Sequence, residues 1–186
     1  MKILLVVAHA RAGSLSHAVA QSFAGDAARA GHAVEWADLA AEGFDPVLRA
    51  ADEPDWDDPA KAYSPEVRAE MARVERNEAT VLVFPVYWWS MPALMKGWID
   101  RVWNHGWAYG GASYPHAKVA MLAVAGGDAA SFAKRGYDRA MEVQLETGIL
   151  RYCGVARPAL HVLYDAFEPE GREKLLARAA ELGRAF

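Results

Sequence analysis

Cysteine is nearly absent from the sequence, because Cys153 is the single thiol in 186 residues. One thiol cannot form an internal disulfide, which excludes a disulfide-stabilised scaffold and favours a reducing compartment. Long apolar runs are also missing, and none approaches the roughly 20 residues that cross a bilayer. Basic residues are not in excess, since the net charge is −4. We therefore expect a cytoplasmic protein with no nucleic-acid partner and no stable membrane insertion.

Metal-ligand spacing is missing among the histidines. His9 follows the first apolar run directly. The other five histidines are His17, His32, His105, His116 and His161. No pair of them has the short, regular separation that zinc sites use. We therefore predict no metal.

The remaining composition is that of an ordinary globular protein. Apolar residues make up 53% of the chain, and no shift in composition or internal repeat marks a boundary. We expect one domain over residues 1–186. The first apolar run, residues 3–8, superficially resembles a signal-peptide core. It leads directly into polar His9 and Arg11 without a small-residue cleavage site, so we interpret it as a buried strand.

Apolar strands alternate with amphipathic helices along the chain. Strands are expected at 3–8, 33–36, 80–84, 118–124 and 159–163, and helices at 15–27, 65–74, 92–103, 133–151 and 168–182. Ser64 is the expected N-cap of the second helix, with Pro65 at its first position. This order predicts an α/β fold, a flavodoxin-like doubly wound five-stranded parallel sheet with helices on both faces. Ligands of such sheets bind beyond the carboxyl ends of the strands.

Residues 42–65 form the least regular part of the chain. They contain Pro46, Pro54, Pro59 and Pro65 and the acidic stretch 52–58. A loop of this length is a solvated surface insertion, or it acts at a dimer interface or over a cofactor. On the 92–103 helix, Lys96, Asp100 and Arg101 are expected to form surface or interface ion pairs.

The loop after the first strand has the composition of an anion site. It reads His9-Ala10-Arg11-Ala12-Gly13-Ser14-Leu15-Ser16 and opens a helix, whose free N–H groups attract phosphate. It matches neither G-x-G-x-x-G nor G-x-x-x-x-G-K-[ST], which disfavours a Rossmann-type dinucleotide fold and a nucleotide hydrolase. The alternative is that Ser14 only caps the helix and Arg11 is a surface charge.

The loop after the third strand is unusually aromatic. It reads Pro85-Val86-Tyr87-Trp88-Trp89-Ser90-Met91-Pro92, and five of the seven tryptophans fall within 20 residues of sequence. Three consecutive aromatic side chains cannot all face one core, so a planar ligand is expected to stack against them. The alternative is an aromatic plug at the sheet edge or a dimer contact.

The loop after the fourth strand carries a glycine pair within Ala125-Gly126-Gly127-Asp128. Glycine lets a backbone approach a ligand closely. A glycine pair that ends a strand also serves as a simple turn.

These segments together resemble the flavodoxin-like NAD(P)H:quinone oxidoreductase family, which includes bacterial members that assist potassium-efflux systems. The resemblance covers nearly the whole chain. It is most specific in the Ala8–Ser14 loop, in the block from Phe84 to Trp103, and in Gly106-Trp107-Ala108-Tyr109-Gly110. Gly126-Gly127 and the segment from Gly148 to Gly154 extend it.

The resemblance implies a flavin site built from the three loops. His9, Ser14, Leu15 and Ser16, with Arg11 beside them, would hold the flavin phosphate. Pro85, Val86, Tyr87, Trp88 and Trp89 would back the isoalloxazine ring, and Ala125, Gly126 and Gly127 would lie along its pyrimidine side. Trp107 and Tyr109 match a segment that walls the nicotinamide and quinone pocket from a neighbouring subunit, so a homodimer is implied.

Three positions depart from patterns of the family, two of them from its mammalian members. A tyrosine and a histidine proposed to relay charge there are matched here by Phe132 and Asp138, and a common threonine is matched by Ala125. Phe132 has no hydroxyl, so it can line the substrate pocket but cannot relay a proton. Tyr109 is the candidate catalytic residue, as a hydrogen-bond donor to the acceptor; the alternative is plain packing.

The implied reaction is a ping-pong transfer of a hydride from NAD(P)H through the flavin to a quinone or nitroaromatic acceptor. The long 42–65 loop favours FAD as the flavin, with FMN as the alternative. A second hypothesis makes the chain a flavin-binding regulatory or ancillary subunit of an ion-efflux system. A one-electron flavodoxin carrier fits poorly, because such carriers are usually strongly acidic and need no nicotinamide pocket.

Overall fold

A single parallel sheet organises the chain, in a computed structural model that describes residues 1–58 and 60–186. Pro59 of the predicted 42–65 loop thus lies outside the described residues. The strand order is β2-β1-β3-β4-β5, which is the flavodoxin-like doubly wound order, and this prediction is confirmed. The strands are β1 (Lys2–Val7), β2 (Ala33–Asp38), β3 (Ala79–Pro85), β4 (Lys118–Val124) and β5 (Arg157–Leu163).

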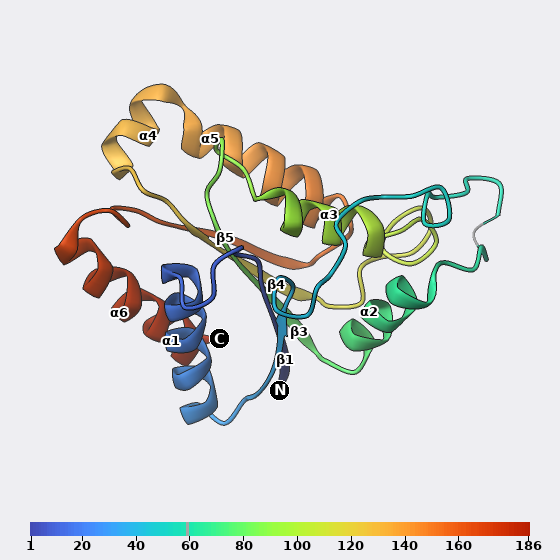
Figure 1. Ribbon diagram of the computed structural model, residues 1–186, viewed down its shortest axis with the longest axis horizontal. Coiled ribbons are helices and arrows are strands. Elements are labelled where there is room, and N and C mark those ends of the chain that lie inside the picture. The colour runs from blue at the N-terminus through green and yellow to red at the C-terminus, as the bar shows by residue number, and fades with distance from the viewer. Residues whose placement is uncertain (59) are drawn as a thin grey trace.

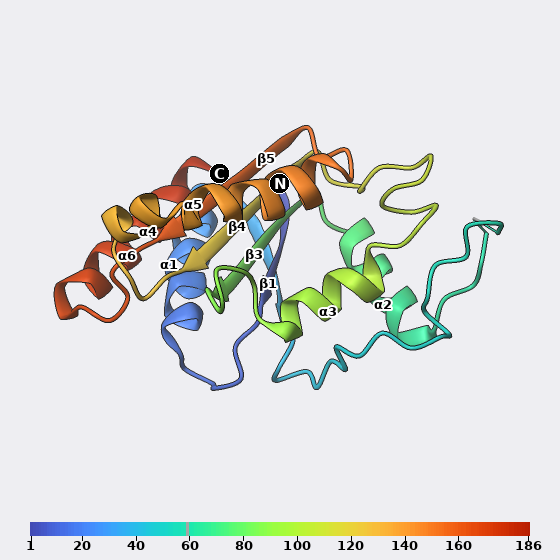
Figure 2. The ribbon, with the colours of Figure 1, turned by 90° about the horizontal axis from the view of Figure 1, so that it is seen from above.

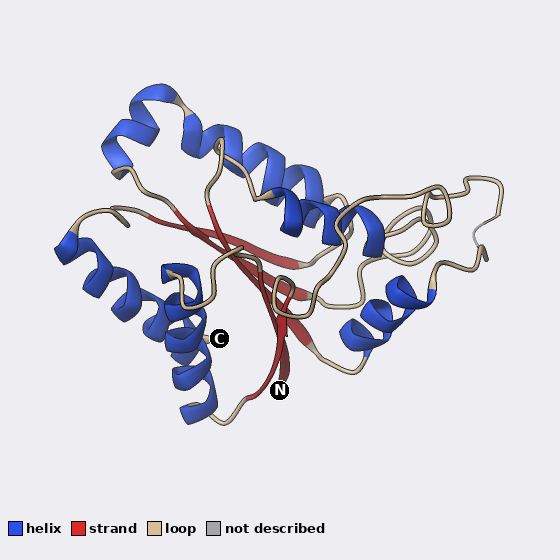
Figure 3. Ribbon diagram, viewed as in Figure 1, coloured by secondary structure: helices blue, strands red, loops and turns tan. Residues whose placement is uncertain are grey.

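Helices cover both faces of the sheet (Figure 1, Figure 3). Helices α1 (Leu15–Arg29) and α6 (Pro169–Ala185) lie side by side on one face. The other face carries α2 (Pro65–Glu75), α3 (Ala93–Val102), α4 (Ala129–Arg135), α5 (Tyr137–Met141) and the π-helix η1 (Glu142–Arg151). The two helix layers explain why the central strands are apolar throughout rather than alternating.

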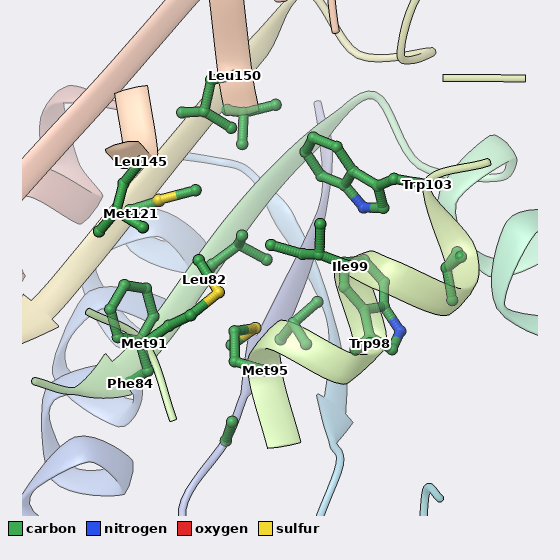
Figure 4. Packing of buried hydrophobic residues seen from close by; sticks show 14 of the residues in the cluster. Leu82, Phe84, Met91, Met95, Trp98, Ile99, Trp103, Met121, Leu145 and Leu150 are labelled. Carbon is green, nitrogen blue, oxygen red and sulfur yellow. The ribbon is translucent and has the colours of Figure 1, made fainter. Parts of the chain in front are cut away.

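Alternate residues of each central strand enter two separate cores. Leu4 and Val6 face the α2–α3–η1 side, whereas Ile3 and Leu5 face α1 and α6. Figure 4 shows the first core, in which Trp98 and the other labelled side chains of α3 pack on the face of β3 and β4. The edge strands β2 and β5 are only partly buried. Burial therefore centres on β1, β3 and β4, whose carboxyl ends open toward the loops of interest.

The helix caps follow the sequence predictions. Ser14 caps α1 by accepting a hydrogen bond from the His17 N–H, and Ser64 caps α2 in the same way, with Pro65 at the first helical position. The predicted single helix over 133–151 is wrong. Gly136 has φ +71°, in the left-handed region, and it divides α4 from α5. Glycine adopts this conformation without the clash that a Cβ would cause, so the chain turns there.

The 42–65 loop is fastened to α3 by a buried ion pair. Arg101 Nη2 lies 2.8 Å from Asp52 Oδ2, and the side chains are 5% and 2% exposed. The predicted surface position of Arg101 is therefore wrong, whereas Lys96 and Asp100 do form an exposed pair of 2.6 Å. Arg101 is buried because the loop folds over α3: Gly97 lies so close to the Pro46 backbone that a Cβ would collide with it.

No helix in the described ranges is both long and apolar enough to span a membrane.

Candidate functional site

A cavity of about 360 Å³ opens at the carboxyl ends of β1, β3 and β4. This position, beside the point where the strand order reverses between β1 and β3, is where doubly wound sheets bind ligands. All three loops singled out in the sequence contribute to its wall. The lining residues are His9, Arg11, Leu15, Ser16, Pro85, Val86, Tyr87, Val124, Gly126, Ala166 and Phe167.

The first loop places donors at one end of this cavity. The Arg11 N–H donates to His9 Nδ1 at 3.0 Å, so a neutral His9 carries its proton on Nε2 and can donate from there. Burial, then the charges of Arg11 and His17, lowers the pKa of His9. Arg11 has no carboxylate partner among the described residues. With no acidic side chain in the first turn of α1, this end suits an anion.

Ser14 does not line the cavity. It is buried, its Oγ lies 2.7 Å from His17 Nδ1, and it accepts the His17 N–H at 3.4 Å. His17 Nε2 in turn lies 2.9 Å from Asp38 Oδ2. The hydroxyl predicted as a phosphate donor is thus engaged in a hydrogen-bonded chain behind the loop, next to Ser16, which does line the cavity.

The aromatic loop is a tight turn with two tryptophans at its centre. Tyr87 and Ser90 exchange backbone hydrogen bonds of 3.0 Å in both directions. Trp88 and Trp89 between them have φ values of 52° and 56°, as a type I′ turn requires. Such turns favour asparagine and glycine, so two bulky residues in this conformation are strained, and strain of this kind clusters at functional sites.

The three aromatic side chains of this turn diverge. Tyr87 lines the cavity, Trp89 stacks on Tyr137 with ring centroids 4.0 Å apart, and Trp88 is 88% exposed. Pro85 and Val86 line the cavity beside Tyr87. The expected divergence is observed, but Trp88 and Trp89 are not part of the cavity wall.

The glycine loop is joined to a fourth loop, residues 164–168, that sequence reasoning missed. The Ala125 carbonyl accepts the Ala166 N–H, and the Gly127 carbonyl accepts the Asp165 N–H, both at 3.0 Å. Phe167, which is 86% exposed, lies so close to Gly126 that a Cβ there would collide with its ring. The signal was available, since these residues follow the carboxyl end of β5 in the way that the other loops follow theirs.

Backbone donors remain free along the glycine loop. The Ala125 N–H donates to the Leu163 carbonyl at 2.7 Å. The N–H groups of Gly126 and Gly127 find no protein acceptor within the ranges that the structure describes. Free donors beside an apolar wall formed by Val86, Val124 and Phe167 match a flat heterocycle with polar edges.

Trp107 and Tyr109 lie elsewhere. Figures 1 and 2 show the 103–117 segment beside the 42–65 loop, at the end of the molecule away from α4 and α6. Trp107 Nε1 donates to Glu75 Oε1 at 2.8 Å. The Tyr109 ring has neighbours at His105, Trp56 and Tyr152, with centroids 5.8, 6.0 and 5.8 Å away. A single chain therefore does not bring these two residues to the cavity.

Phe132 is buried beneath the glycine loop. Its ring meets Tyr137 and Tyr164 edge-on, at 5.8 and 5.2 Å between centroids. Tyr164 begins the fourth loop, and Phe132 packs against it rather than lining the cavity. No group of three or more His, Cys, Asp or Glu side chains suited to a metal occurs in the described part of the chain.

A doubly wound sheet with a helix start suited to an anion and an apolar slot at its switch point defines a flavodoxin-like protein. The family model described as flavodoxin-like fold matches residues 1–185, and the chain belongs to this family.

Named relatives and a solved structure agree with the assignment to this family. YcaK of Escherichia coli (strain K12), named as an uncharacterised NAD(P)H oxidoreductase, is 37% identical over 173 residues, which cover 92% of this chain and 88% of YcaK. NAD(P)H dehydrogenase (quinone) 1 of Rattus norvegicus is 29% identical over 201 residues, covering 94% and 73% of the two chains. The structure of an NAD(P)H:quinone oxidoreductase from Methanothermobacter marburgensis superposes with a TM-score of 0.94 at 28% identity, covering 99% and 94%. The resemblance predicted from the sequence is confirmed.

Proposed function

We propose that this chain is a flavin-dependent NAD(P)H oxidoreductase that reduces quinones or similar acceptors, nitroaromatics included, by two-electron ping-pong transfer. The observation that carries the proposal is the cavity itself, with anion donors at the start of α1 and an apolar slot at the aromatic and glycine loops. The names of the relatives support the same reaction class. The ancillary-subunit hypothesis gains no support from either source.

The flavin supplies hydride acceptance and donation when it is bound, and the chain supplies binding and electrostatics. His9, Arg11 and Ser16 would hold the phosphate, while Pro85, Val86 and Tyr87 would lie against the ring. The free N–H groups of Gly126 and Gly127 would stabilise negative charge on the ring's polar edge, as an oxyanion hole does. Phe167 adds an apolar side that the sequence analysis did not include.

Subunit pairing would complete this site. Trp107 and Tyr109 lie at the other end of the molecule from the cavity. We therefore propose that they line the cavity of a second copy in a homodimer. Tyr109 would then donate its phenolic hydrogen to an acceptor oxygen. Burial raises the pKa of Tyr109, with smaller contributions from Tyr63 and Tyr152, so its hydroxyl stays protonated at neutral pH and can donate.

FAD remains our proposal for the flavin, with FMN as the alternative. The 42–65 loop runs beside the 103–117 segment (Figure 2), and its Trp56 neighbours Tyr109, so the loop would reach an adenine only across a dimer. Two fold neighbours, an azoreductase of Bacillus anthracis and general stress protein 14 of Treponema denticola, have structures in complex with FMN. Chromatography of the flavin released from purified protein decides between the two.

Mixed dimers test the shared site. A Tyr109→Phe chain has an intact cavity, and a Gly126→Asp chain has an intact Tyr109. Each homodimer should lose much of its quinone reduction, whereas a mixture of the two should regain one working site per mixed dimer. Purified protein that stays colourless and binds neither FMN nor FAD would contradict the proposed function as a whole.

A further inference from the structure

Ser14, His17 and Asp38 form a buried chain of hydrogen bonds directly behind the anion end of the cavity. Ser14 Oγ lies 2.7 Å from His17 Nδ1, and His17 Nε2 lies 2.9 Å from Asp38 Oδ2. Ser14 and His17 are 3% and 8% exposed. His17 was not among the residues predicted for the site. A hydroxyl, an imidazole and a carboxylate thus lie in line next to the residues that would hold a phosphate.

This chain of groups is not a nucleophilic triad. A nucleophilic serine must reach its substrate, but Ser14 is buried, is absent from the cavity wall and caps α1. The chemistry open to these three groups is the placement of a proton.

Two protonation states of His17 are compatible with the hydrogen bonds of this chain. The Asp38 carboxylate only accepts, so neutral His17 carries its proton on Nε2 and accepts the Ser14 hydroxyl proton at Nδ1. In the doubly protonated ring, Nδ1–H donates to Ser14 Oγ, and the Ser14 hydroxyl keeps its proton and rotates it away from His17. One proton taken from solvent therefore switches the chain without moving a helix or strand.

Few other charges face His17. Asp38 reaches it from β2, and His9 from the loop after β1, with ring centroids 6.3 Å apart. Arg11 lies on the same loop, where its charge lowers the pKa of His9. Strands β1 and β3 present apolar side chains to α1, and Arg184 of α6 pairs with Asp26 at the far end of α1. A phosphate at His9, Arg11 and Ser16 would be a second negative group beside His17, and negative neighbours favour the imidazolium form.

We propose that His17 is a positioning residue that takes up one proton when the flavin phosphate binds, with Asp38 as its fixed counter-ion. The inference rests on the proposed function, because it concerns the phosphate end of the same cavity. Coupling between two binding events is reciprocal. Phosphate affinity therefore falls as the pH rises and His17 gives up its proton.

Titration of the flavin-free protein tests this coupling. FAD is the probe, because its pyrophosphate lacks the second ionisation, near pH 6, of a phosphate monoester. Riboflavin, which has no phosphate, is the matched ligand. For the wild type, FAD affinity should fall by up to about tenfold per pH unit where binding is coupled to the uptake of one proton, while riboflavin affinity stays level. His17→Gln keeps an amide donor toward Asp38 but cannot gain a proton, so its FAD affinity should fall less steeply with pH, with only the contribution of His9 remaining, and its riboflavin affinity should match the wild type.

A control variant and a spectroscopic measurement distinguish proton uptake by His17 from a general effect of the substitution on the fold. His32→Gln changes a histidine that bonds the amino terminus, and it should behave as the wild type. Nitrogen-15 NMR of the wild-type protein should show both His17 ring nitrogens protonated with FAD bound, but only Nε2 protonated without it. An unchanged neutral ring, or an equal loss of FAD and riboflavin in His17→Gln, would overturn the proposal. A wild type that binds neither flavin at any pH would overturn the proposed function as well.

Discussion

Asp52 and Arg101 lie 49 positions apart in the sequence and meet in a buried ion pair at the base of the 42–65 loop. The same carboxylate accepts hydrogen bonds from the Ser64 N–H at 2.8 Å and the Ser64 hydroxyl at 3.0 Å. Arg101 also contacts Glu66 at 2.6 Å and donates to the Asp45 carbonyl. The pair thus ties α3, the loop and the start of α2 together. Because Trp56 of this loop neighbours Tyr109, the pair fixes the far end of the proposed shared site.

Removal of the carboxylate should destabilise the fold. Asp52→Ala takes away the buried partner of Arg101 and leaves the guanidinium with only the exposed carboxylate of Glu66 as counter-ion, which costs up to about 3 kcal/mol of unfolding free energy. Asp57→Ala, in the same loop but exposed, is the matched control and should change stability by less than about 0.5 kcal/mol. Urea unfolding of both variants measures the difference, and equal midpoints would show that the pair contributes nothing.

The same carboxylate should contribute to acid unfolding. Burial alone would raise the pKa of Asp52, but the hydrogen bonds from Arg101 and Ser64 outweigh it and hold the pKa below its ordinary value. A depressed folded-state pKa stabilises the fold above the unfolded-state value, about 3.9, and this stability is lost as the pH falls through the folded-state pKa. Unfolding free energy measured from neutral to acid pH should therefore fall less steeply for Asp52→Asn than for the wild type.

The strained turn predicts a substitution that raises the unfolding free energy. Trp88→Asn replaces an exposed residue at φ 52° with one that tolerates the left-handed region, so the unfolding free energy should rise by about 1 kcal/mol. Trp89 stays unchanged because its ring packs on Tyr137. If the turn is strained for the sake of ligand contact, the same variant should bind flavin or NAD(P)H more weakly. A variant less stable than the wild type would refute the strain.

Two glycines provide a matched pair. Gly136 adopts φ +71° where a Cβ meets no other atom, so Gly136→Ala should cost about 1–2 kcal/mol through backbone strain alone. At Gly25, inside α1, a Cβ would make only an ordinary contact with the end of the Arg29 side chain, so Gly25→Ala should raise the unfolding free energy by up to about 1 kcal/mol. Thermal unfolding of both proteins tests whether the chain truly breaks between α4 and α5.

Local patterns in the sequence were enough for the sheet and for most of the cavity wall. Strands that are apolar at every position require cover on both faces, and the ends of such strands locate the ligand loops. His9 and Val86 line the cavity for that reason. Contacts between distant segments were not visible in this way. Arg101 has the helical spacing of a surface residue, and only the folded loop carrying Asp52 buries it.

The remaining differences have the same origin. Gly136 interrupts a pattern whose apolar spacing continues on both sides, so periodicity alone predicted one helix. In the sequence, Phe167 belongs to what looks like an ordinary surface loop. In the structure, backbone hydrogen bonds from that loop to the glycine loop place Phe167 against Gly126. Trp88 and Trp89 were expected on the cavity wall, but the left-handed turn directs them elsewhere. The role of Tyr109 stays a prediction, because the cavity that it is proposed to line belongs to a second chain.

Anaerobic titration of the purified, flavin-loaded protein with NAD(P)H tests the central claim most directly. The account predicts that the visible absorbance of the oxidised flavin is lost after one equivalent of NADH or NADPH, and that it returns when one equivalent of a simple quinone is added. A flavin that stays oxidised in the presence of excess NADH and NADPH would contradict it.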